Sequence, residues 1–269
     1  MLTSPQPRRR RARQQRSLRQ EYGEFILERI EEFKQQISRE ELLAIADEAV
    51  RELEVGPDEQ LVLTEVLVLE HVDRLIMRRL NLPTYRRWRA RHLKLRRAQR
   101  EPTHWGLDPD TPFTELAQEL DDEGDALVVG AGAAPAAFYL AAHDWPVVFI
   151  DQELATVEAA ERRAAAEALA SRFQALVVSL GDWFPDVMSL LVVIDPAALG
   201  PLDTASRGAF FEALTTHTMH GGVHCILPPE PTASVAASGL GGLKAHYSGW
   251  RIEPRGQRQA PDWLVAVKS

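Results

Sequence analysis

The feature that most constrains this chain is the stretch from Ala126 to Ala141, which runs from apolar residues through two glycines into an alanine-rich segment. An apolar run followed by helical spacing indicates a buried parallel strand that leads into a helix. Gly130 and Gly132 permit positive φ and a close approach of a ligand to the backbone. The N–H groups that begin the helix are free donors at its positive dipole end. The stretch predicts a nucleotide-binding turn, and a tight turn without a ligand is the simpler alternative.

The chain after this turn alternates between strands and helices. Further strands are expected at Trp145–Asp151, Phe173–Ser179, Ser189–Asp195 and after Gly221-Gly222. Such alternation specifies a parallel sheet with helices on both faces. Two last strands, expected at Lys244–Ile252 and Pro261–Val267, leave no room for a crossover helix and predict an antiparallel hairpin. The predicted fold is α/β, a Rossmann-like doubly wound sheet of about seven strands with a terminal antiparallel hairpin, preceded by an all-α N-terminal helical domain.

Charge divides the chain into two parts of opposite sign. Residues 1–100 hold 22 Lys and Arg against 16 Asp and Glu, a balance of +6, whereas residues 101–269 hold 9 against 23, a balance of −14. The two balances add to the net charge of −8. A change of this size predicts a domain boundary near residue 100.

The first hundred residues predict a bundle of helices. Apolar residues recur at steps of three and four from Leu18, and Ser38 with Glu41 forms a capping box that opens a second helix. Gly56-Pro57 ends that helix, and two more are expected before residue 100. Four segments follow from this pattern: a disordered basic tail at 1–16, a helical bundle at 17–100, a linker at 101–110 and a second domain at 111–269.

The end of the bundle is strongly basic. From Arg74 to Arg100 there are eleven Lys or Arg and no Asp or Glu. We expect this segment to pack on the acidic second domain. The alternative is an RNA surface, because arginine pairs bidentately with phosphate and clustered cations gain from counterion release. The residues that would form that surface are Arg86, Arg87, Arg89, Arg91, Lys94, Arg96 and Arg97.

Acidic residues follow three of the predicted strands. Asp151 ends the second strand, 21 positions after Gly130. An acid there can accept hydrogen bonds from both ribose hydroxyls of a nucleoside, and it can also cap the next helix. Asp182 and Trp183 follow the third strand, and Asp195 follows the fourth.

Together the glycine turn, these acids and the terminal hairpin resemble the class I S-adenosylmethionine-dependent methyltransferases, over about residues 111–269 and not over 1–100. The resemblance implies S-adenosyl-L-methionine as the cofactor. The glycine turn would hold its methionine end, Asp151 its ribose, and Asp182 with Trp183 its adenine. Asp195 would lie where the methyl group meets the substrate, as the candidate catalytic base. The implied cofactor-binding residues are Gly130, Ala131, Gly132, Asp151, Gln152, Asp182, Trp183 and Asp195.

The sequence departs from the family pattern at two positions. Val128 stands where the family has an acid, and Ala134 replaces the third glycine and is followed by Pro135. These departures leave open a non-catalytic member of the fold. A dinucleotide such as NAD or FAD is a further alternative, because the glycine turn also approximates the dinucleotide fingerprint.

The leading functional hypothesis is a methyltransferase that acts on a small molecule, with the N-terminal helices as lid and acceptor pocket. An RNA-associated methyltransferase and a non-catalytic binding protein are the alternatives. His71, His92 and His104 are other candidate bases. No metal site is expected, because the histidines near residue 220 lack regular ligand spacing.

Location is predicted from cysteine use and from the N-terminus. The single cysteine, Cys225, has no partner within the chain for a disulfide. The arginine-rich beginning lacks the apolar segment of a secretory signal, and no apolar run reaches the roughly 18 residues of a membrane span. We expect a cytoplasmic protein.

Overall fold

The computed structural model describes residues 17–54, 65–120, 124–229, 239–253 and 263–269. It divides into two compact units, one ending at Lys94 and the other beginning at Leu95. The predicted basic tail at 1–16 and the Gly56-Pro57 helix end lie outside the described residues. The domain boundaries expected from the sequence stay predictions.

The first unit is helical, as the apolar periodicity predicts. Its helices are α1 (Leu18–Gln36), α2 (Arg39–Glu54), α3 (Glu65–Arg79) and α4 (Tyr85–Gln99), the last of which continues into the second unit. The predicted capping box is confirmed, because Ser38 Oγ accepts from Glu41 N at 3.2 Å and Glu41 Oε2 accepts from Ser38 N at 2.8 Å. The core of this unit consists of Ile26, Ile30, Ile45, Ala49, Val72, Leu75 and Ile76.

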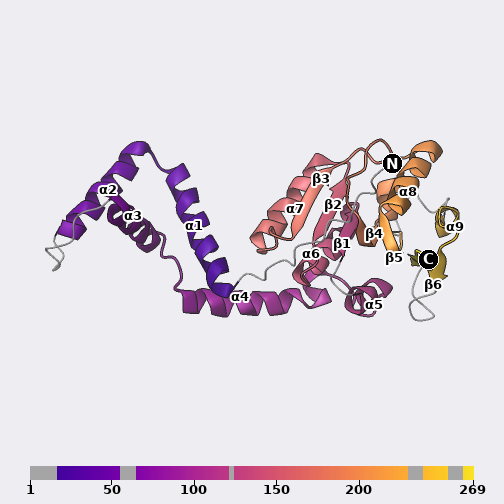
Figure 1. Ribbon diagram of the computed structural model, residues 1–269, viewed down its shortest axis with the longest axis horizontal. Coiled ribbons are helices and arrows are strands. Elements are labelled where there is room, and N and C mark those ends of the chain that lie inside the picture. The colour runs from indigo at the N-terminus through magenta and orange to yellow at the C-terminus, as the bar shows by residue number, and fades with distance from the viewer. Residues whose placement is uncertain (1–16, 55–64, 121–123, 230–238, 254–262) are drawn as a thin grey trace, which may run out of the picture. The chain divides into compact units, whose positions relative to one another are not determined.

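The second unit is built on a seven-stranded sheet among the described residues. Its strands are β1 (Asp125–Val129), β2 (Val147–Asp151), β3 (Phe173–Val177), β4 (Ser189–Ile194), β5 (Thr218–Ile226), β6 (Arg251–Glu253) and β7 (Leu264–Val267). They lie in the order β3-β2-β1-β4-β5-β7-β6, and the first five run in that order across Figure 1. Strands β1 to β5 are parallel, and β7 is antiparallel to both β5 and β6. The predicted Rossmann-like fold is confirmed.

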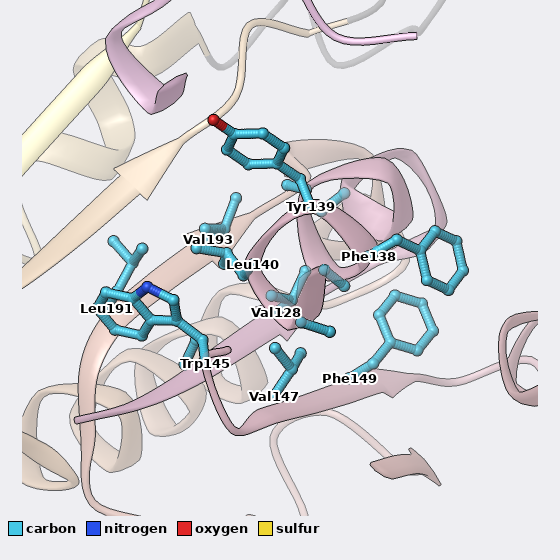
Figure 2. Packing of buried hydrophobic residues seen from close by; sticks show 14 of the residues in the cluster. Val128, Phe138, Tyr139, Leu140, Trp145, Val147, Phe149, Leu191 and Val193 are labelled. Atoms are coloured by element: carbon cyan, nitrogen blue, oxygen red, sulfur yellow. The ribbon is translucent and has the colours of Figure 1, made fainter. Parts of the chain in front are cut away.

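Helices cover both faces of this sheet. One face packs against α5 (Pro112–Glu119), α6 (Ala134–Ala142) and α7 (Leu154–Ala166), and the other against α8 (Thr204–Thr216) and α9 (Gly239–Lys244). Side chains of β1 alternate between the two cores: Val128 faces α6 (Figure 2), whereas Leu127 and Val129 face the α8 side. Because both faces are buried, the central strands are apolar throughout.

Asp144 binds the C-terminal end of α4. Asp144, in the turn between α6 and β2, lies 3.1 Å from Arg96, 3.2 Å from Arg100 and 2.8 Å from Arg172. These last residues of α4 belong to the second unit, where their arginines pair with Asp144. The packing expected for the rest of the basic segment stays a prediction. In the segment predicted to be a linker, Trp105 is buried in the core beneath α6.

The strand expected at Lys244–Ile252 and the start of the strand expected after Gly221-Gly222 are both wrong in detail. Residues 244–252 do not form one strand, because α9 ends at Lys244 and β6 begins at Arg251. Leu243 and Tyr247, four positions apart, both face the core, which is helical spacing and not alternation. The expected turn at Gly221-Gly222 lies inside β5, where the register with β4 is irregular.

A polar chain is buried between β5, α8 and α9. Thr218 Oγ1 donates to the Leu214 carbonyl at 2.6 Å, so it accepts from His224 Nε2 at 2.7 Å. His224 Nδ1 then accepts from the Tyr247 hydroxyl at 3.0 Å. Because one ring nitrogen of His224 donates and the other accepts, its imidazole must be neutral. Burial lowers the pKa of His224 to about 3, and the nearby Lys268 charge acts in the same direction.

We expect acid to destabilise the protein through His224. The folded-state pKa lies below the ordinary value of 6.5, so the unfolded chain binds the extra proton between about pH 6.5 and pH 3. This contribution to the free energy of unfolding is present above pH 6.5 and is lost at roughly 1.4 kcal/mol per pH unit as the pH falls through that window. Urea titrations from pH 7 to 4 measure it. His224→Gln flattens the dependence, whereas His220→Gln, at an exposed position of the same strand, leaves it unchanged; equal slopes for all three proteins would contradict the assignment.

Candidate functional site

The predicted site residues that follow β1, β2 and β4 meet at the carboxyl edge of these three adjacent strands. Strand β1 lies between β2 and β4, so the residues that follow these strands are neighbours. Gly130 N donates to the Ile150 carbonyl at 3.0 Å, next to Asp151, and Asp195 N donates to the Val129 carbonyl at 2.8 Å, next to Gly130. A crevice outside the carboxyl ends of parallel strands is where open α/β sheets bind ligands.

Asp195 braces the glycine turn. Its Oδ2 accepts from Gly132 N at 2.9 Å, and its Oδ1 accepts from Ala197 N at 2.9 Å. Both carboxylate oxygens therefore already bind backbone N–H groups. One of the donors that the turn offers to a ligand is satisfied by the protein itself.

The two glycines are required by the close approach of the segment after β4. A Cβ built on Gly132 would lie 2.6 Å from Asp195 Oδ2, nearer than side chains tolerate. A Cβ on Gly130 would lie 2.8 Å from the Ala198 Cβ and 2.9 Å from the Asp195 Cβ, and Gly130 has φ +93°. The sequence interpretation assigned these glycines to ligand approach, and the structure adds an internal reason for both.

Gln152 links the two strands that flank the turn. Its Nε2 donates to the Ala198 carbonyl at 3.2 Å, which joins the residues after β2 to those after β4. No sequence pattern points to Ala198, because its role depends only on the strand order. This bond and the Asp195 brace hold three loops of the carboxyl edge together.

Asp151 is a nearly buried carboxylate with few partners. It is only 7% exposed, and its Oδ1 accepts from Glu153 N at 2.8 Å. Within the residues that the structure describes, this is the only hydrogen bond to the Asp151 side chain. The bond orders the residues before α7, and the carboxylate keeps capacity to accept from a further donor.

Asp182 and Trp183 lie in the segment that connects β3 directly to β4. The Ser179 hydroxyl donates to Asp182 Oδ2 at 2.7 Å. Trp183 is 56% exposed, and so is Leu154, at 59%, at the start of α7. Leu154 was not selected from the sequence, although its place three residues after Asp151 is the signal that could have found it. Two large apolar side chains are thus exposed in the segments that follow β2 and β3.

The two departures from the family pattern have structural explanations. Val128 is fully buried among Leu140, Val147 and Val193 beneath α6 (Figure 2), so this position contributes packing. Ala134 begins α6, and Pro135 falls in the first helical turn, where its missing N–H costs nothing.

The candidate histidines have carboxylate partners of their own. In the first unit, His71 pairs with Glu52 at 2.8 Å and His92 with Glu21 at 3.0 Å. In the second, His104 lies 3.5 Å from Glu167. The structure therefore brings together Gly130, Gly132, Asp151, Gln152 and Asp195.

Among the described residues no group of three or more His, Cys, Asp or Glu side chains is arranged to hold a metal ion. Likewise, none of the described helices has the length and apolar character to cross a membrane.

Comparisons with known proteins give similarity at the level of solved structures. No protein-family model and no curated protein matches the chain. A glycopeptide N-methyltransferase MtfA complexed with S-adenosyl-L-homocysteine is 20% identical, with a TM-score of 0.38 over 57% of this chain and 56% of that chain. The N-methyltransferase NodS from Bradyrhizobium japonicum is 14% identical, with a TM-score of 0.43 over 66% and 93%. An O-methyltransferase family protein from Burkholderia thailandensis is 16% identical, with a TM-score of 0.41 over 58% and 54%. The chain spans about half the length of the first and third of these structures.

We predict that Gly132→Ala depends on Asp195, whereas Gly130→Ala does not. All three atoms that a Cβ on Gly132 would meet belong to the Asp195 carboxyl group. Gly132→Ala alone should lower the free energy of unfolding by about 1–3 kcal/mol, and much less in an Asp195→Ala background. Gly130→Ala should cost a similar amount in both backgrounds, since its φ and the Ala198 contact remain. Chemical denaturation of the variants measures this, and additive costs for Gly132→Ala and Asp195→Ala would refute the brace.

Proposed function

We propose that the sheet unit binds S-adenosyl-L-methionine at its carboxyl edge and transfers the methyl group to a small-molecule acceptor. The observation that carries this proposal is Asp151, a carboxylate 7% exposed, beside the glycine turn and with one backbone partner among the described residues. A carboxylate so buried is stable when further donors reach it. The two ribose hydroxyls of a nucleoside supply such donors at the end of a second parallel strand.

The other site residues have matching parts in this proposal. The Gly130–Gly132 turn holds the methionine end of the cofactor, and Gln152 lies beside the ribose. Asp182 accepts from the adenine amino group, while Trp183 and Leu154 cover the purine with their exposed apolar surfaces. Bound S-adenosyl-L-methionine supplies an electrophilic methyl group on a sulfonium.

We assign Asp195 a positioning role. Both its oxygens accept backbone N–H groups at 2.9 Å, so this carboxylate already shapes the glycine turn. Catalysis then depends on placing the acceptor in line with the methyl group, which by itself lowers a barrier substantially. This arrangement suits an acceptor whose nucleophilic atom carries no proton that the enzyme must remove. Asp195 as the catalytic base stays the alternative.

The acceptor pocket belongs to the same proposal. The N-terminal helices are proposed as its lid, because the sheet domain has few residues left to build a pocket. A non-catalytic binding protein with this fold is the second candidate, favoured by the internal occupation of the Gly132 N–H. Methyl transfer to an acceptor distinguishes the enzyme from the non-catalytic binding protein.

Isothermal titration calorimetry tests the cofactor assignment. We expect the wild-type protein to bind S-adenosyl-L-methionine and Asp151→Asn to bind it at least tenfold more weakly, because each hydrogen bond to a charged group contributes about 1.5–3 kcal/mol. The amide side chain of this variant retains an oxygen that can accept from Glu153 N, so the fold is preserved. Asp186→Asn, at an exposed position after β3, is the matched control and should bind as the wild type does.

Absence of heat with millimolar S-adenosyl-L-methionine would exclude the proposal, as would equal affinities of wild type and Asp151→Asn. Tighter binding of NAD than of S-adenosyl-L-methionine would favour the dinucleotide alternative. Formation of S-adenosyl-L-homocysteine with a panel of small-molecule acceptors identifies the enzyme, and binding without turnover favours the non-catalytic protein.

A further inference from the structure

The exposed side of α4 carries a set of cations that the proposed function does not use. We call it the basic face of α4; it consists of Arg86, Arg87, Arg89, Arg91 and Lys94, which are all exposed. All five belong to the first unit. Arg96 and Arg100, which follow on the same helix, pair with Asp144 and are not part of this face.

The basic face is not neutralised by the described residues. None of its five cations makes an ion pair or a side-chain hydrogen bond with another described residue. Other arginines of the same unit do: Arg29 lies 2.6 Å from Glu32 and Arg78 lies 2.6 Å from Glu52, and Arg79 pairs with Glu48. These arginines are neutralised within the chain, whereas the charge of the basic face of α4 is open to a partner of opposite sign.

The opposite side of α4 is already occupied. Trp88 is buried, with ring centroids 5.4 Å from Tyr22 of α1 and 4.6 Å from His92. The Tyr22 hydroxyl donates to the Pro83 carbonyl at 3.0 Å, which fixes the beginning of the helix. A helix that binds a membrane surface inserts an apolar side, and here that side packs against α1. Only Leu93 offers substantial apolar surface on the exposed side, too little to anchor a protein partner.

The arrangement of the cations favours a flexible polyanion. At 3.6 residues per turn, the five positions cover roughly 200° around the helix axis. A rigid duplex touches a helix over a narrower arc, whereas a single strand can bend its phosphates around it. The cations are mostly arginine, which binds phosphate bidentately, and no Asn or Gln accompanies them to read base edges. Contacts of this kind bind nucleic acid without sequence preference.

We propose that the basic face of α4 binds single-stranded RNA through its phosphates. RNA is the single-stranded nucleic acid that cells contain in abundance, and cation-to-phosphate pairing is the chemistry that this face offers. The site does not depend on the cofactor or on the carboxyl edge of the sheet. The two proposals therefore succeed or fail separately.

Fluorescence anisotropy with the full chain and a labelled single-stranded RNA of mixed sequence tests the proposal. Five phosphate contacts predict a slope of log Kobs against log salt of about −3.5. Arg86→Gln with Arg89→Gln should reduce the magnitude of that slope by about 1.4 and weaken binding at low salt about tenfold or more. Glutamine is a good helix former and both positions are exposed, so the fold is retained, which circular dichroism checks.

The matched control is Arg29→Gln with Arg74→Gln, which removes two exposed and paired cations of the same unit. Its RNA binding should equal that of the wild type, and an equal loss in both double variants would overturn the proposal in favour of net charge alone. Salt-independent or undetectable binding would overturn it as well. So would tighter binding to duplex DNA, to single-stranded DNA of the same sequence, or to anionic phospholipid vesicles than to RNA.

Discussion

The carboxylate of Asp195 holds the carboxyl edge of the sheet in its shape. It accepts one N–H from the glycine turn after β1 and one from its own turn after β4, so two loops share one charged group. The close approach that results leaves no room for a side chain at residue 130 or 132. Gln152 adds a third loop through the Ala198 carbonyl. The edge is thus preorganised by the protein itself, and Asp151 is left with capacity to accept from a ligand.

Asp144, in the turn between α6 and β2, is a second carboxylate that joins separate segments of the chain. Asp144 pairs with Arg96 of α4, with Arg100, which directly follows α4, and with Arg172 in the turn before β3. A part-buried carboxylate shared by three arginines is stabilised more than an exposed surface pair would be. The same helix carries five unpaired cations between residues 86 and 94. One helix therefore combines an intramolecular anchor with a charged face that is available to a partner.

Local patterns in the sequence predict much of this structure because they depend on neighbours along the chain. The Ser38–Glu41 capping box forms as its spacing predicts, and the strand-turn-helix unit around Gly130 lies where the apolar run and the glycines place it. Two predictions near the C-terminus are wrong. Leu243 and Tyr247 lie in a helix and a turn and not in a strand, and Gly221-Gly222 lies within the irregular strand β5. In both segments the secondary structure depends on contacts with residues that are distant in sequence.

The sequence by itself determined the Rossmann-like α/β class, the place of the glycine turn and the acids that follow the strands, because period, caps and turn residues act over a few positions. Only the tertiary structure decided what those residues contact. Gly132 and Asp195 are 63 positions apart, and Gln152 and Ala198 are 46 apart, and they meet because β1 lies between β2 and β4. The same holds for the arginines of α4, which are alike in sequence. Whether each one pairs with a carboxylate or faces outward depends on the packing of the helix around Trp88 and Asp144.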